Sequence, residues 1–300
     1  MKLLLPDNPR ILGQGITGRE GRLAATAMVN YGTKIVAGVT PGKGGQTLDG
    51  IPIFNTVAEA LAMVGPVDAS VQFVPPLLTY AACGEALEAG IHFILIGAER
   101  VPTKDIAMIL SLAEHYKAVI VGPSSVGLIN PRQKLKLGVI GGRHPETIYQ
   151  GGDIAVISKS GGMTAEISFL LKRFNRGVSW AIGIGGDRLI GSDFADWLMA
   201  IETDPMTRAS IIFGELGGTY EERVADLVRG GRITKPVIAL VVGDFATHLP
   251  SDVQFGHAGA LIENGQGEPA TKRKVLKTAG VLVANQFDDL IRLIEQAAPR

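Results

Sequence analysis

The chain has very little cysteine: Cys83 is the single one among 300 residues. One cysteine excludes an internal disulfide and a metal cage built from thiolates. The histidines are also few, and their positions show no metal-ligand spacing. They are His92, His115, His144, His248 and His257. We therefore expect no metal site in this chain.

The chain also lacks an excess of charge, because 29 Lys and Arg residues balance 29 Asp and Glu residues. No block of like charge stands out, so neither nucleic acid nor an acidic membrane surface is an expected partner. No apolar run reaches about 18 residues, and the N-terminal Met-Lys-Leu-Leu-Leu-Pro run is too short for a signal peptide. Hydrophobic residues make up 46% of the chain and charged residues 19%, which excludes disorder. We expect a globular, cytoplasmic protein.

Glycine, in contrast, is plentiful: its 39 residues gather at the ends of short apolar runs. These runs alternate with stretches whose apolar residues recur at helical spacing. Continuously apolar strands separated by helices of about 10–15 residues predict a parallel sheet covered on both faces. The pattern therefore indicates a doubly wound α/β architecture.

The alternation breaks around 127–150, where two turn-rich polar stretches occur. It then resumes with apolar runs such as 154–157 and 236–242. We therefore predict two α/β domains, 1–126 and 151–300, joined by a linker at 127–150.

Gly13-Gln14-Gly15-Ile16-Thr17-Gly18 is a literal G-x-G-x-x-G that follows a strand and opens a helix at Arg19. Glycines of this spacing let the backbone approach a phosphate at the helix N-terminus, although a strand–helix turn without a ligand is the alternative. An NAD site needs an acidic residue about 20 residues further on. That place holds Val39–Gly45, where Lys43 suits a phosphorylated ribose or a pyrophosphate; NADP remains possible. The spacing is not that of a Walker A loop either, so no ATP site is indicated.

The second domain opens with another candidate anion site. Ser160 is placed to cap a helix, and Gly161 and Gly162 leave the helix N-terminus open to an anion. A serine-hydrolase elbow is the rival, but its G-x-S-x-G spacing is absent. Glu215 follows a later apolar run, at the strand ends that line the crevice of a parallel sheet; the alternative is a solvent-facing loop glutamate.

His257 lies in Gly256-His257-Ala258-Gly259, a sterically bare setting from which an imidazole can reach a cleft. Imidazole is a good nucleophile toward phosphorus and can carry a phosphoryl group covalently. Glu215 could bind the other ring nitrogen and fix the tautomer. A structural loop histidine is the alternative.

Together these motifs resemble the α (CoA-binding) subunits of the succinyl-CoA synthetase superfamily of ADP- or GDP-forming acyl-CoA ligases, over nearly the whole chain. The fold that the resemblance implies is an N-terminal Rossmann-like CoA-binding domain followed by a flavodoxin-like, doubly wound ligase domain. The matching segments keep the order of that family. They are 13–18, 31–34, 39–45, 54–57, 183–187, 214–218 and 256–260.

The resemblance also implies roles for residues. His257 would be transiently phosphorylated and Glu215 would orient it, while ATP and Mg²⁺ would bind mainly to an ATP-grasp β-type (large) subunit in an αβ or α₂β₂ hetero-oligomer. The residues implied to bind coenzyme A are Thr17, Gly18, Arg19, Glu20, Lys43, Gly97, Ala98 and Glu99.

Departures from the succinate enzymes point to citrate as the acid. Those enzymes read S-G-T-L-T-Y-E where this chain has Ser160–Glu166, so that Ala165 replaces a tyrosine. The Ser160–Met163 turn is similar to the citrate-binding S-G-G-M turn of ATP-citrate lyase. Arg188, in place of a proline, is a candidate citrate contact, although a surface arginine is the alternative. We therefore expect Ser160, Gly161, Gly162 and Arg188 to bind citrate or phosphate.

The sequence thus predicts the small subunit of a citryl-CoA synthetase, which leaves citryl-CoA cleavage to a separate lyase, since no cleavage module follows Arg300. The first alternative is a succinyl-CoA synthetase α subunit, or a subunit acting on another dicarboxylate. The second is a non-catalytic protein that senses CoA or a dinucleotide. A sensor would have no need of His257 with Glu215.

Overall fold

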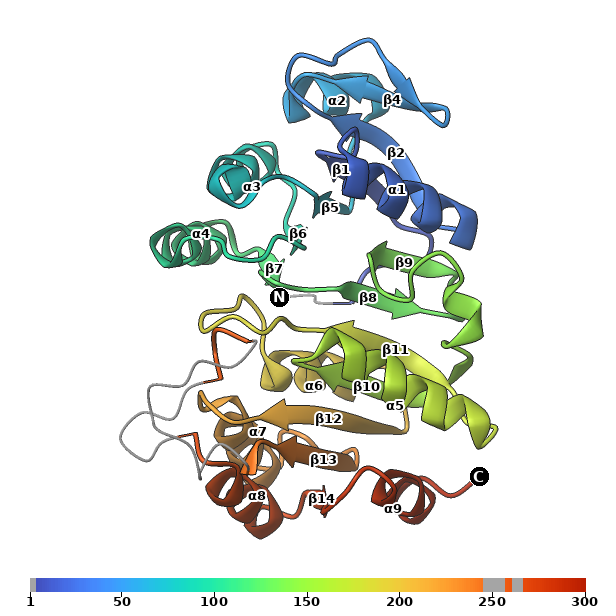
Figure 1. Cartoon of the computed structure of the whole chain (residues 1–300), viewed down its shortest axis with the longest axis vertical. Helices are drawn as coiled ribbons and strands as arrows, with labels where there is room; N and C mark the ends of the chain where they lie inside the picture. Colours follow the sequence, from blue (N-terminus) through green and yellow to red (C-terminus); the bar gives the residue numbers. More distant parts are fainter. Residues whose placement is uncertain (1–3, 245–256, 261–266) are drawn as a thin grey trace. The chain divides into compact units, whose positions relative to one another are not determined.

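The computed structural model describes residues 4–244, 257–260 and 267–300. The chain divides into two compact units: residues 1–146 with 189–192, and residues 147–188 with 193–300. Each unit is built around parallel strands with helices between them (Figure 1). The structure therefore confirms the predicted α/β class.

The sheet of the first unit reverses its strand order beside β1. Its strands are β1 (Arg10–Gln14), β2 (Lys34–Val39), β3 (Thr47–Leu48), β4 (Ile51–Phe54), β5 (Ala69–Gln72), β6 (Phe93–Ile96) and β7 (Val119–Val121). They follow one another in the order β3-β4-β2-β1-β5-β6-β7. All pairs are parallel except β3 with β4. Such a reversal, here between β1 and β5, is where open α/β sheets bind ligands.

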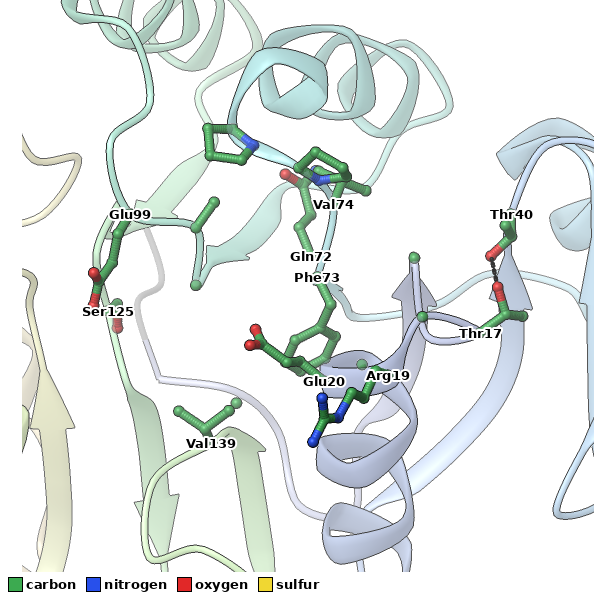
Figure 2. A pocket seen from close by; sticks show the side chains of 18 of the residues that line it. Thr17, Arg19, Glu20, Thr40, Gln72, Phe73, Val74, Glu99, Ser125 and Val139 are labelled. Atoms are coloured by element: carbon green, nitrogen blue, oxygen red, sulfur yellow. Dashed lines mark hydrogen bonds between the residues drawn. The ribbon is translucent and has the colours of Figure 1, made fainter.

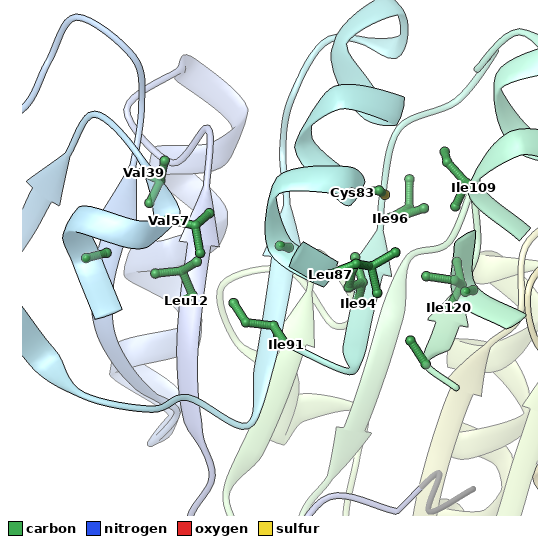
Figure 3. Packing of buried hydrophobic residues seen from close by; sticks show 14 of the residues in the cluster. Leu12, Val39, Val57, Cys83, Leu87, Ile91, Ile94, Ile96, Ile109 and Ile120 are labelled. Atoms are coloured by element: carbon green, nitrogen blue, oxygen red, sulfur yellow. The ribbon is translucent and has the colours of Figure 1, made fainter. Parts of the chain in front are cut away.

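Helices cover both faces of this sheet. They are α1 (Arg19–Tyr31), α2 (Val57–Val64), α3 (Thr79–Glu88) and α4 (Thr103–Tyr116), with a short 3₁₀ helix at Pro76–Leu78. On one face, α2, α3 and α4 pack on strand side chains such as Leu12, Ile94 and Ile120 (Figure 3). On the other face, Ala25 of α1 packs in a cluster with Ile51 and Ile53 of β4. These continuously apolar strands form the core because neither of their faces meets water.

The stretch 127–150, expected as a linker, contains two strands of its own. β8 (Gly127–Asn130) and β9 (Leu135–Gly138) form an antiparallel hairpin in the first unit. The polar turn residues form the tip of the hairpin, where the Asn130 side chain accepts hydrogen bonds from two backbone N–H groups. Leu128, Leu135 and Leu137 are buried on either side of that tip. The turn signals were read correctly, but their short apolar flanks were not recognised as strands.

The second unit reverses its strand order beside β10. Its parallel strands are β10 (Gly151–Ser158), β11 (Val178–Gly183), β12 (Ala209–Glu215), β13 (Val237–Val242) and β14 (Leu282–Ala284). They follow one another as β14-β13-β12-β10-β11, which is the flavodoxin-like order. The carboxyl ends of β10 and β12 therefore meet at the place where this fold binds ligands.

The described part of this unit has five helices, four that lie between these strands and α9, which follows β14. They are α5 (Gly161–Arg173), α6 (Phe194–Glu202), α7 (Tyr220–Arg229), α8 (Pro269–Thr278) and α9 (Asp289–Ala297). The Ser160 hydroxyl caps α5 by accepting the Met163 N–H (3.4 Å), as expected for that position. Asp193 and Asp196 form a capping box that begins α6.

Candidate functional site

The first candidate site is a cavity of about 930 Å³ in the first unit, at the carboxyl ends of β1, β5 and β6 (Figure 2). All eight residues expected to bind coenzyme A line it: Thr17, Gly18, Arg19, Glu20, Lys43, Gly97, Ala98 and Glu99. Figure 2 draws the labelled lining residues, among them Arg19 and Glu20 of α1, Phe73 after β5 and Glu99 after β6. Segments that are far apart in the sequence thus meet around one cavity.

The glycine loop brings the backbone close to this cavity. Gly15 has a φ of +76°, and a Cβ there would lie 2.7 Å from the carbonyl oxygen of Phe73. A Cβ on Gly21 would lie 2.6 Å from the carbonyl oxygen of Gly15. Gly18 begins α1 without a side-chain cap, so first-turn N–H groups of α1 are left for an anion. This part of the cavity fits the phosphates of a nucleotide-containing cofactor.

A second loop brings a cation to the same cavity. The Asn55 side-chain oxygen accepts hydrogen bonds from Gly42 N–H (2.9 Å) and Gly44 N–H (3.0 Å), which hold the turn around Lys43. Thr17 donates to the Thr40 hydroxyl (3.1 Å), linking this turn to the glycine loop. Lys43 is exposed at the rim of the cavity. A mobile lysine on a fixed turn can meet a phosphate as a point charge.

Sequence reasoning missed the cavity wall formed by the end of β5. Gln72 lines the cavity and is fully buried, with its amide donating to Gln14 Oε1 (3.0 Å). Behind it, the Cys83 thiol hydrogen-bonds to Gln72 Oε1 (3.3 Å). The available signal was the apolar run 70–74, whose two polar residues, Ser70 and Gln72, stand at the switch point.

The second candidate site pairs His257 with Glu215, at the carboxyl end of β12. His257 Nδ1 lies 2.9 Å from Glu215 Oε1 and 2.8 Å from Oε2. Burial would raise the pKa of Glu215, but the hydrogen bond with His257 and the charge of Lys159 outweigh burial and hold this pKa below its usual value. An ionised carboxylate on Nδ1 favours the Nδ1–H tautomer, in which Nε2 is unprotonated.

Glycines make room for the imidazole. A Cβ on Gly186 would lie 2.5 Å from Cδ2 of His257. The Gly259 N–H donates to the carbonyl oxygen of Gly186 (3.0 Å), and the Ala260 N–H donates to that of His257 (3.1 Å). The histidine therefore lies on a short turn that rests on the loop after β11. Its side chain is 33% exposed, so the ring is accessible.

Two lysines that sequence reasoning missed lie beside this pair. Lys159, directly after β10, has its Nζ 3.4 Å from Glu215 Oε1. Lys272 of α8 donates to the carbonyl oxygens of Glu215 (3.0 Å) and Gly217 (2.5 Å), and to the Glu221 carboxylate. Lys272 and Glu221 are both fully buried. Lys159 directly follows the apolar run that became β10, which was the available signal for it, whereas no local pattern indicates Lys272 within α8.

The residues expected to bind citrate or phosphate lie in two places: Ser160, Gly161 and Gly162 at the start of α5, and Arg188 in the loop after β11. Ser160 follows Lys159 directly, so α5 begins beside Glu215. A Cβ on Gly162 would have Ser160 Oγ, at 3.9 Å, as its nearest neighbour, so this helix end is open. Arg188 is exposed, and its backbone carbonyl accepts the Tyr220 hydroxyl (3.0 Å). The structure thus places Ser160 after β10, the strand next to the one that ends in Glu215, and shows Arg188 at the surface.

Within the described residues, none of the helices has the length and apolar character needed to cross a membrane. Over the same residues, no group of three His, Cys, Asp or Glu side chains is arranged to hold a metal ion.

Two family models match this chain, and each match begins in a different one of the two compact units. Residues 7–100 match the model of a CoA binding domain, and residues 157–282 match that of a CoA-ligase. A subunit of ADP-forming sulfoacetate–CoA ligase from Acholeplasma sp. is 38% identical, with 99% of this chain and 98% of that protein covered. The α subunit of an ADP-forming succinate–CoA ligase from Aquifex aeolicus is 39% identical, with 94% and 90% covered.

A solved ATP citrate lyase from Methanosaeta concilii, in complex with (3S)-citryl-CoA, superposes with a TM-score of 0.89 at 26% identity. The superposition covers 99% of this chain and 50% of that one, so this chain spans half the length of that lyase. The two matched family models and the 37–39% identity to ligase subunits over nearly the whole chain identify the family. The chain belongs to the α-subunit family of ADP-forming acid–CoA ligases.

Proposed function

We propose that this chain is the CoA-binding, phosphohistidine-bearing subunit of a ligase that forms citryl-CoA from citrate, CoA and ATP. The observation that carries the mechanism is the contact of both Glu215 oxygens with His257 Nδ1, at 2.9 and 2.8 Å. ATP and Mg²⁺ would be held mainly by an ATP-grasp partner subunit. Relatives named as α subunits of succinate–CoA ligases support the need for a partner.

The transfer begins at Nε2 of His257. Its lone pair forms a bond to the γ-phosphorus of ATP while the bond from phosphorus to the ADP oxygen breaks. The Nδ1 proton stays between the imidazole and Glu215, so the histidine does not need to lose a proton. The phosphoryl group then passes to a carboxylate of the acid, and the electron pair of the P–N bond returns to Nε2. The acyl phosphate so formed yields the thioester and inorganic phosphate when the CoA thiol attacks.

In this proposal the cavity of the first unit holds CoA. Its glycine loop and the uncapped α1 N-terminus donate N–H groups to the pyrophosphate, and Lys43 binds the phosphate on the ribose. Thr17, Arg19 and Glu20 position the nucleotide. The end of β6, with Gly97 and Glu99, contacts the adenine–pantetheine portion.

The choice of citrate rests on the N-terminus of α5. Ser160, Gly161 and Gly162 form the N-terminus of α5, which is open at Gly162. Ala165 replaces the tyrosine of the succinate enzymes, and in this proposal the smaller side chain leaves space for a larger acid. The structural likeness to a citrate lyase bound to citryl-CoA supports citrate. Succinate is the second candidate, since several relatives are named as succinate–CoA ligases, and the relative named for sulfoacetate makes that acid a necessary comparison.

The test is thioester formation by this chain together with its ATP-grasp partner subunit. We expect radiolabel from [γ-³²P]ATP on His257, stable to base and labile to acid, and its discharge by citrate plus CoA with formation of citryl-CoA. The variant His257→Asn is expected to stay unlabelled. Label that persists in this variant would overturn the mechanism. Faster discharge by succinate or sulfoacetate would overturn the choice of acid and leave the mechanism intact.

A further inference from the structure

Lys159 is a buried charge that the proposed reaction does not use. Its side chain is 1% exposed, and its Nζ lies 3.4 Å from Glu215 Oε1 and 5.6 Å from the centre of the Tyr220 ring. An ammonium group is strongly hydrated, so removing it from water is costly unless an opposite charge compensates. Glu215 supplies that charge, and the same carboxylate binds His257 Nδ1. The Glu215 carboxylate therefore interacts with both the Lys159 ammonium group and the His257 imidazole.

Among the described residues, several charged side chains lie on the elements around the His257–Glu215 pair. They are Lys159 after β10, Asp187 and Arg188 after β11, Glu215 of β12, Glu221 of α7 and Lys272 of α8, with Tyr220 of α7 as a further titratable group. Glu221 is paired with Lys272, and both are fully buried. Glu215 is paired with Lys159. These two pairs sum to zero charge while the imidazole is neutral.

A carboxylate beside an imidazole favours the protonated ring, and it does so more strongly when water is excluded. Protonation would place a hydrogen on Nε2 and remove the lone pair that must attack phosphorus. A second cation on the same carboxylate acts in the opposite direction, because it repels the imidazolium and offsets the charge of Glu215. Asp187 and Arg188 carry opposite charges and add no net charge to this balance.

We propose that Lys159 is a positioning residue that keeps His257 neutral, with its proton on Nδ1 and Nε2 unprotonated. This role rests on the proposed function, because it prepares the histidine for the phosphoryl group. Lys159 acts through Glu215 and need not touch the substrate. It leaves the carboxylate ionised, so that Glu215 still fixes the tautomer.

The test is a ¹⁵N NMR titration of His257 in the full chain, without nucleotide or acid. In Lys159→Met we expect the pKa of His257 to rise by about one unit, which is a roughly tenfold higher ratio of imidazolium to imidazole at a given pH. Lys159→Arg keeps the charge and is expected to titrate like the wild type. The exposed Lys104→Met on α4 is the matched control and is expected to cause no change.

The readout does not depend on turnover, so it separates this proposal from the proposed function. If His257 titrates as expected but is never phosphorylated, the function fails while the charge role stands. When His257 is labelled with [γ-³²P]ATP in the presence of the partner subunit, the labelling rate falls at acidic pH. In Lys159→Met we expect the apparent pKa of this fall to rise by about one unit as well. If Lys159→Met does not fold, Lys159→Gln is the second variant, because it removes the charge and keeps a polar side chain. An unchanged or lower pKa of His257 in a folded, uncharged variant would overturn the proposal.

Discussion

Gly186 and His257 are in such close contact that a Cβ on the glycine would lie 2.5 Å from Cδ2 and 2.6 Å from Cγ of the imidazole. Only a residue without a side chain leaves the ring in its place against Glu215. The two residues are about seventy positions apart in the sequence. The position of the imidazole therefore depends on the absence of a side chain at residue 186.

Gly186→Ala should therefore displace the imidazole while leaving the fold intact. A shift of about 1 Å in a reacting group can cost about a hundredfold in rate, and we expect a loss of that order in His257 phosphorylation. The measurement is the initial rate of labelling with [γ-³²P]ATP in the presence of the partner subunit. Gly84→Ala on α3 is the matched control, because no atom lies within 4 Å of the added Cβ. Equal rates in the two variants would contradict the prediction.

Lys272→Met should strongly destabilise the second unit. It leaves the Glu221 carboxylate buried without its cation, and it removes a donor from two backbone carbonyls. Breaking a buried ion pair from one side typically costs about 3–5 kcal/mol. Urea unfolding at pH 7 measures this cost, and the further change Glu221→Gln should recover part of it. Arg292→Met breaks an exposed pair with Asp289 and should cost no more than about 1 kcal/mol. If Lys272→Met and Arg292→Met lowered the free energy of unfolding by similar amounts, the prediction of a buried, strongly coupled Lys272–Glu221 pair would be wrong.

Lys136→Met should stabilise the protein at neutral pH. Burial lowers the pKa of Lys136 to about 8, from an ordinary value of 10.5. The charged amine therefore destabilises the fold below about pH 8, by about 3 kcal/mol, and this cost disappears as the pH rises to 10.5. Methionine removes the cost but leaves the Gly138 carbonyl without its donor, a loss of about 1 kcal/mol.

The net gain from Lys136→Met is then roughly 2 kcal/mol at pH 7, and it should turn into a small loss above pH 10.5. Urea unfolding at both pH values checks the change of sign. Exposed Lys104→Met is the control and should show no such dependence. A gain that is the same at both pH values would argue against a buried charge.

Lys43→Ala should weaken CoA binding by about tenfold, which corresponds to about 1.4 kcal/mol. Because the proposed contact is with the phosphate on the ribose, binding of dephospho-CoA should change little. Asn55→Ala should act in the same direction, since Asn55 holds the turn that carries Lys43. Calorimetric titration with the two ligands makes the comparison. Equal losses for both ligands would place Lys43 elsewhere on the cofactor.

Ala165→Tyr should lower the use of citrate more than that of succinate. A tyrosine would fill the space near the N-terminus of α5 that the larger acid is proposed to need. The measurement is kcat/KM for both acids in the assembled enzyme, so that each acid serves as the control for the other. Equal losses would show that Ala165 does not line the acid site.

The sequence predicted the two α/β units and the glycine loops from local patterns, namely apolar runs that end in glycine. The residues expected to bind coenzyme A, which line the first cavity, came instead from the family resemblance. The hairpin β8–β9 was missed because the polar turn between its two short strands was interpreted as part of a linker. Lys159, Glu221 and Lys272 were missed for another reason. Their significance depends on burial and pairing between distant segments, which a single sequence does not encode in a short pattern.

Cys83 offers a practical opportunity for following ligand binding. Its side chain is fully buried, and burial raises the pKa of the thiol to about 12. Since thiolates are the reactive form, maleimide reagents should leave this residue unmodified in the folded state. With no other cysteine in the chain, a thiol introduced at an exposed position becomes a unique attachment point for a fluorophore. A dye near the Lys43 turn would then report the arrival of a nucleotide in real time, without any removal of native cysteine.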